Sequence, residues 1–203
     1  MKFSVLLSAL LLSASFAMAD ESSTNKPAET SHAVKALKIK AEQGDADAEF
    51  SLGGCYYEGI GVTQDKAEAV RWYEKAAEHG IVEAQFMVGL NYWLGMDVKM
   101  DEAKGAKWFQ KAAEEGEPGA IFYLGGAYYL GKGVKQDYVQ SYKWILVFKE
   151  SGHGLIPKDM SDAEYKIKEL ESKLTKEQIA EGKRLAKEKI AELRKKPRFS
   201  ETS

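Results

Sequence analysis

The sequence predicts an all-α protein built from repeated pairs of helices. Three observations predict this class: a period of 36 residues, apolar residues at four-residue spacing within each period, and glycines where the helices would end. The residues that recur at this period include Trp72, Trp108 and Trp144; Gly44, Gly80, Gly116 and Gly152; Tyr56, Tyr92 and Tyr128; and Asp65, Asp101 and Asp137. A period of this length indicates one supersecondary unit per repeat, stacked so that neighbouring units complete each other's core.

The composition supports a folded, soluble chain. Of 203 residues, 44% are hydrophobic and 30% are charged, which is too apolar for a disordered chain and too polar for a membrane bundle. The 29 Lys and Arg residues nearly balance 31 Asp and Glu residues, so a protein built mainly to hold nucleic acid is not expected. The single cysteine, Cys55, excludes an internal disulfide framework and a multi-cysteine zinc site.

The first element, residues 1–19, has the pattern of a secretory signal peptide. Lys2 precedes an apolar run over residues 3–16, and a small-x-small cleavage pattern ends at Ala19. The apolar run is short for a bilayer-spanning helix, which needs about 20 residues. We therefore expect cleavage after Ala19 and export to the periplasm or beyond the cell. The polar residues 20–32 that follow lack apolar periodicity and predict a flexible leader.

The repeats are expected over residues 33–152, as a partial repeat followed by three full repeats. Residues 33–44 read as the second helix of a partial unit, and the full units span 45–80, 81–116 and 117–152. In the first full unit, Ala48, Leu52 and Tyr56 recur every fourth residue and therefore share one helical face.

Each full unit also carries the signals that would separate its two helices. Gly59 and Gly131 suit the left-handed position just beyond a helix C-terminus. The recurring aspartates, of which Asp65 is the first, are placed to cap the second helix, with Glu68 as a capping-box partner. The tryptophans and an Ala-Ala pair would form the buried face of that second helix.

The repeat resembles a known family. Its residues in the first unit include Ala46-Ala48, Leu52-Gly53, Tyr56, Gly59, Gly61-Val62, Asp65, Trp72, Ala76-Ala77 and Gly80. This pattern resembles the Sel1-like repeat, a relative of the tetratricopeptide repeat. The resemblance implies a right-handed α/α superhelical solenoid with a concave face, in a family whose members mostly act as adaptors for other proteins. The third unit has Phe148-Lys149 in place of the Ala-Ala pair, so regular stacking is not expected beyond it.

Residues 153–203 are expected to form two capping helices and a basic tail. Ser161 with Glu164, and Thr175 with Gln178, match capping boxes that would open the two helices. This segment carries 13 basic and 10 acidic residues, whereas 33–152 carries 14 and 18. The basic excess fits either a patch for an acidic partner or the simpler case of solvated cations near a helix C-terminus.

The search for catalytic chemistry is negative. No histidine has a second histidine or cysteine at metal-ligand spacing, so no metal or cofactor is expected. Some cysteine-rich relatives are linked to β-lactamase activity, which would need SxxK at the start of a helix. The match from Ser23 to Lys26 falls in the polar leader and is followed by a proline. We therefore expect a protein that is not an enzyme.

An aromatic ladder is the candidate binding site. Each first helix carries two aromatic residues seven positions apart, and the second of each pair forms the set Tyr57, Trp93 and Tyr129. These side chains would either anchor a protein or peptide on the concave face or pack between successive repeats. The first interpretation predicts a non-enzymatic interaction scaffold with an unidentified protein partner, no nucleic acid, and no membrane segment after signal cleavage.

The alternative function is an envelope protein that binds or modifies cell-wall glycan. The ladder could stack on sugar rings, and glycan cleavage would need a pair of convergent carboxylates. Glu49 and Glu58 are the candidates in the first repeat, but neither recurs in the later repeats.

Overall fold

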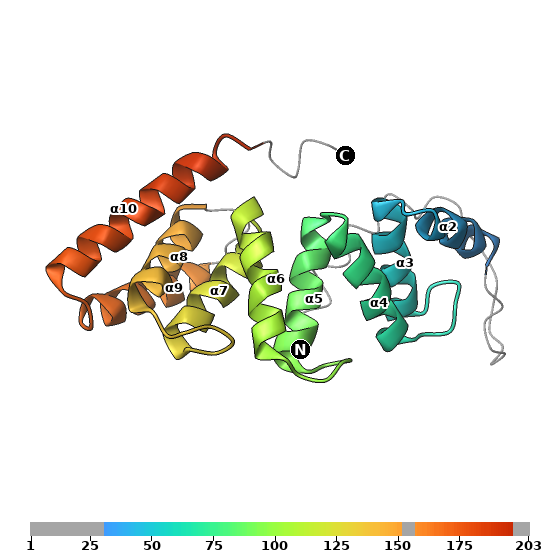
Figure 1. Cartoon of the computed structure of the whole chain (residues 1–203), viewed down its shortest axis with the longest axis horizontal. Coiled ribbons are helices and arrows are strands. Elements are labelled where there is room, and N and C mark those ends of the chain that lie inside the picture. The colour runs from blue at the N-terminus through green and yellow to red at the C-terminus, as the bar shows by residue number, and fades with distance from the viewer. Residues whose placement is uncertain (1–30, 152–156, 197–203) are drawn as a thin grey trace.

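The computed structural model describes residues 31–151 and 157–196, and every regular element within those ranges is an α-helix. The helices form an elongated array with α2 at one end and α9 and α10 at the other (Figure 1). Their bounds are α2 His32–Glu42, α3 Ala46–Glu58, α4 Lys66–Glu78, α5 Val82–Leu94, α6 Glu102–Glu115, α7 Pro118–Leu130, α8 Tyr138–Ser151, α9 Pro157–Glu171 and α10 Lys176–Leu193. The all-α solenoid is confirmed, whereas the signal peptide and nearly all of the leader lie outside the described residues.

The helix ends follow from the capping residues that the sequence supplies. The side chain of Asp65 accepts the backbone N–H of Glu68 at 2.9 Å, and Asp101 and Asp137 do the same for the other second helices. Gly59 and Gly131 adopt φ values of 74° and 68°, which confirms their predicted place beyond the first helices. The capping-box role expected for Glu68 is wrong, because its carboxylate instead pairs with Arg71 at 2.8 Å.

The core lies between the two helices of each repeat. The three recurring tryptophans are at most 8% exposed, and the Ala76-Ala77 pair is fully buried, as predicted. Glycine lets the two helices approach closely, since a Cβ at Gly53 would lie 2.6 Å from the Tyr73 ring. A Cβ at Gly89 would lie 2.7 Å from the Phe109 ring in the same way. The recurring glycine therefore serves helix packing.

The first helices α5 and α7 contact each other directly. Phe86 of α5 reaches α7, where its ring lies 6.1 Å from that of Tyr123 and against Gly119. This contact joins the first helices of the second and third repeats. The second helices α4 and α6 are joined instead by the ion pair between Glu74 and Lys104.

Polar contacts also join neighbouring repeats. Lys104 of α6 donates to the Glu74 carboxylate of α4 at 2.6 Å, and the Tyr92 hydroxyl of α5 donates to the same carboxylate at 2.7 Å. Burial raises the pKa of Tyr92, and the hydrogen bond to Glu74 raises it further. Three helices from two repeats therefore share one network.

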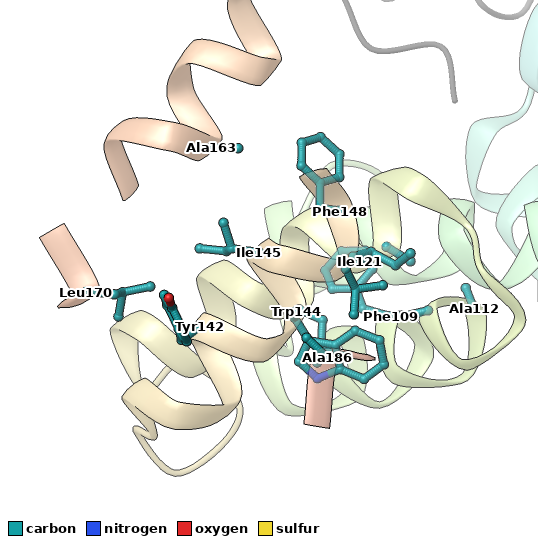
Figure 2. Close-up of a cluster of buried hydrophobic side chains, with 14 of the residues drawn as sticks. Phe109, Ala112, Ile121, Tyr142, Trp144, Ile145, Phe148, Ala163, Leu170 and Ala186 are labelled. Carbon is teal, nitrogen blue, oxygen red and sulfur yellow. The ribbon is translucent and has the colours of Figure 1, made fainter. Parts of the chain in front are cut away.

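The regular stacking ends after α8. The substituted Phe148 is buried and its ring packs on Phe122 at 5.3 Å. Helix α9 follows α8 as the next first helix would, but α10 then packs against α8 rather than against α9. Figure 2 shows Leu170 of α9 and Ala186 of α10 joining the cluster around Trp144. Helices α9 and α10 therefore cover the end of the solenoid.

One detail of the C-terminal prediction is wrong and one is confirmed. Helix α9 begins at Pro157, so Ser161 lies inside the helix and cannot open it, because proline already suits the first helical position. Tyr165 lies within this helix and is 70% exposed. The capping box of Thr175 and Gln178 is present with both reciprocal hydrogen bonds.

Candidate functional site

The aromatic ladder residues lie near the C-terminal ends of the first helices, next to the loops within each repeat. Tyr57, Trp93 and Tyr129 belong to α3, α5 and α7, and each side chain is partly buried. The loops that follow these helices emerge along the lower edge of the array (Figure 1). The three residues therefore occupy equivalent places, but their contacts differ.

Tyr57 and Trp93 are held to different degrees. The Lys66 ammonium lies 5.2 Å from the centre of the Tyr57 ring, and that ring makes no aromatic contact within the described residues. Trp93 packs edge-on against the ring of Phe109, with 5.7 Å between the ring centres. Tyr57 is thus the ladder residue with the least aromatic packing.

Tyr129 is engaged by helix α9. Its hydroxyl donates to the carboxylate of Glu169, and the Lys166 ammonium lies 4.1 Å from the centre of its ring. The hydrogen bond to Glu169 raises the pKa of Tyr129 to about 12. The same carboxylate is paired with Lys166, which is the main cause of its lowered pKa. Tyr129 therefore also holds helix α9 of the C-terminal segment against α7.

A row of exposed apolar side chains runs beside the ladder. We refer to Ile60, Leu94, Met96, Met100 and Leu130, which are 45–59% exposed, as the loop-edge row. Leu94 and Leu130 directly follow ladder residues at the ends of α5 and α7, and the others lie in the adjoining loops. The sequence analysis did not predict this row. A signal for it was present, because the second repeat has Leu94 and Met100 at positions where the first repeat has a polar glutamate and glutamine.

The two candidate carboxylates do not form a pair. Glu49 is 2% exposed, and its carboxylate lies 2.7 Å from Nδ1 of His79 at the end of α4. Glu58 is exposed at the opposite end of α3, nine positions further along the helix. At 1.5 Å of rise per residue this separates them by about 13 Å along the axis. Glu49 therefore has a packing role with His79.

We expect His79→Ala to destabilise the protein by about 1–3 kcal/mol, since it leaves the buried Glu49 carboxyl group without its partner. Combining it with Glu49→Gln should recover part of that loss, because Gln85 occupies the equivalent buried position in the second repeat. Urea unfolding followed by circular dichroism measures both effects. A His79→Ala variant as stable as the wild type would show that the pair contributes nothing.

Cys55 is the only cysteine in the sequence. Burial raises the pKa of the Cys55 thiol, which disfavours the reactive thiolate form. In residues 31–151 and 157–196, no cluster of three or more His, Cys, Asp or Glu side chains could hold a metal ion. No helix in those ranges combines the length and apolar character needed to cross a membrane. Ser23 and Lys26 lie outside the described residues.

Comparison with known proteins agrees with the helical geometry. The sequence profile of the Sel1 repeat matches residues 46–81, 82–117 and 118–146. The solved structure of a Sel1 repeat protein from Oxalobacter formigenes is 32% identical, with a TM-score of 0.58. The match covers 68% of this chain and 99% of that one. This chain belongs to the Sel1 repeat family. Sel1 repeat proteins generally act as non-catalytic scaffolds for protein interactions.

Two further solved structures are similar in sequence. A protective antigen of uropathogenic Escherichia coli strains, described as displaying an SLR fold, is 27% identical, with a TM-score of 0.46. That match covers 84% of this chain and 45% of the antigen. The cysteine-rich protein B of Helicobacter pylori is 26% identical, with 64% and 96% of the two chains covered and a TM-score of 0.47. No curated protein matches the chain.

Proposed function

We propose that this Sel1 repeat protein is an exported, non-enzymatic scaffold that binds a partner protein along the ends of its first helices. The aromatic ladder would supply large, partly buried contact surfaces, and the loop-edge row would supply exposed aliphatic ones. The partner would contribute an apolar segment that lies across the successive repeats.

The observation that carries this proposal is the exposure of the loop-edge row. Leu94, Met96 and Met100 are each about half exposed, and all three lie within seven residues of one another. Large apolar side chains grouped on a surface indicate an interaction site. Methionine also adapts its shape to different partners. Similar exposure at Ile60 and Leu130 extends the site over three repeats.

The row can be altered with little effect on the fold. We expect Leu94→Ser, Met100→Ser and Leu130→Ser together to reduce partner capture by about tenfold or more, since exposed side chains at an interface centre carry much of the binding energy. The matched control is Ile39→Ser with Tyr165→Ser, which removes exposed apolar side chains elsewhere. Affinity capture after cross-linking in the native envelope, read by mass spectrometry, compares the variants.

Two further measurements complete the test. Tyr57→Ala probes the ladder itself, and we expect it to weaken capture while the helical circular dichroism signal is kept. Mass spectrometry of the N-terminus in the exported fraction should find Asp20 first, since cleavage is expected after Ala19. Equal capture by the wild type and the row variant would overturn the proposed site, and a retained N-terminus in the cytoplasm would overturn export.

A further inference from the structure

A recess lies between the C-terminal halves of α8 and α10, away from the ends of the first helices. Its volume is about 370 Å³, and we call it the α8–α10 groove. Its lining residues are Leu146 and Glu150 from α8, and Lys183, Ala186, Lys187, Ile190, Ala191 and Arg194 from the α10 side. The spacing of the α10 residues, at intervals of three and four, places them on one helical face.

The floor of the groove is apolar and its α10 wall is basic. Leu146, Ala186 and Ile190 form the floor, and the small side chain of Ala191 leaves space above it. In the two earlier repeats, the position of Leu146 holds Glu74 and Gln110, so the apolar floor is particular to the repeat that α10 covers. Lys183, Lys187 and Arg194 line the rim, against the single acidic residue Glu150.

The cations of this rim are left without close partners. Among the described residues, Lys187 and Arg194 form no ion pair, and Lys183 has only a long contact of 3.7 Å to Glu171. Elsewhere on α10, Arg184 pairs with Glu181 at 2.7 Å, and Lys189 pairs with Glu114 of α6. Like charges four residues apart on a helix repel each other, so an acidic partner would relieve a repulsion that the free protein retains.

We propose that the α8–α10 groove binds an acidic protein segment that carries an aliphatic side chain. The aliphatic group would lie on the Leu146 and Ile190 floor, and carboxylates on either side would pair with Lys187 and Arg194. A recessed floor suits a peptide side chain better than a flat anionic membrane, because Ala186 is only 2% exposed. The site is independent of the loop-edge row and does not rest on the proposed scaffold function.

The test selects ligands with the full chain as bait. Phage-displayed random decapeptides are enriched on the wild type, and the enriched peptides are then measured by fluorescence anisotropy. We expect them to combine Asp or Glu with Leu, Ile or Val. Lys187→Glu with Arg194→Glu should weaken their binding by about tenfold or more. Ala191→Trp should do the same by filling the groove.

The matched control is Lys168→Glu with Lys176→Glu. These residues are exposed, have no ion-pair partner in the described chain and lie outside the groove, so the change in net charge is identical. Retained binding by this control, with loss in both groove variants, supports the proposal. Enriched peptides without acidic residues, or equal binding by Ala191→Trp, would overturn it. Groove-dependent binding to phosphatidylglycerol vesicles, with no acidic peptide enriched, would also overturn it.

Discussion

Replacing Phe109 by alanine is expected to destabilise the protein by about 3–5 kcal/mol, the cost typical of removing a fully buried aromatic side chain. Phe109 has no exposed surface, and its ring lies 5.0 Å from Tyr123, 5.7 Å from Trp93 and 6.0 Å from Phe86, measured between ring centres. One side chain of α6 thus joins α5 to α7. Its removal would leave a cavity at the junction of the second and third repeats.

The control for this change is Phe122→Ala. Phe122 has the same chemistry, but it is 47% exposed, so its removal should cost about 1 kcal/mol or less. The shift in the urea midpoint, followed by circular dichroism, measures both variants. Similar losses in the two variants would contradict the assignment of Phe109 as the residue that joins the repeats.

Gly89→Ala is expected to destabilise the protein by about 1–3 kcal/mol, although alanine is the better helix former. The added methyl would lie 2.7 Å from two carbons of the Phe109 ring and 3.4 Å from the carbonyl oxygen of Gly105. Because both neighbours belong to the closely packed α6, they cannot move aside without opening the contact between the two helices.

Gly126→Ala provides a control of opposite sign. Gly126 lies inside α7, and no atom is found within 4 Å of the place where its Cβ would be. Alanine there should stabilise the protein by up to about 1 kcal/mol through helix propensity alone. Thermal unfolding of the two variants checks the pair. Stabilisation by both changes would mean that the contact at Gly89 is looser than the structure has it.

The sequence was informative about the fold because its signals are local and repeated. The aspartate caps, the glycines beyond the first helices and the buried tryptophans each depend on a few neighbouring residues, and the structure confirms them. Helix α9 was placed less well, since Ser161 with Glu164 matched a capping box inside a helix that begins at Pro157. A local pattern cannot show whether an earlier residue already starts the helix.

The contacts between distant residues could not be read from the sequence. His79 meets Glu49 thirty residues away, and Lys189 meets Glu114 seventy-five residues away. The first pair depends on how α4 packs against α3, and the second on how α10 turns back over α8, which no periodicity encodes. The aromatic ladder was visible as a pattern, but its three residues proved unequal, because only Tyr129 is bound by α9. Their role in binding stays a prediction.

The central claim is that the ends of the first helices form the partner-binding surface. Site-specific photo-cross-linking tests it most directly, with a photoreactive phenylalanine analogue placed at Leu94, Leu130, Arg71 or Lys107 in cells that express the full chain. All four positions are exposed, and the last two lie on the second helices α4 and α6. We predict that one polypeptide is cross-linked from Leu94 and Leu130 and not from Arg71 or Lys107. The same polypeptide cross-linked only from Arg71 and Lys107 would contradict the claim.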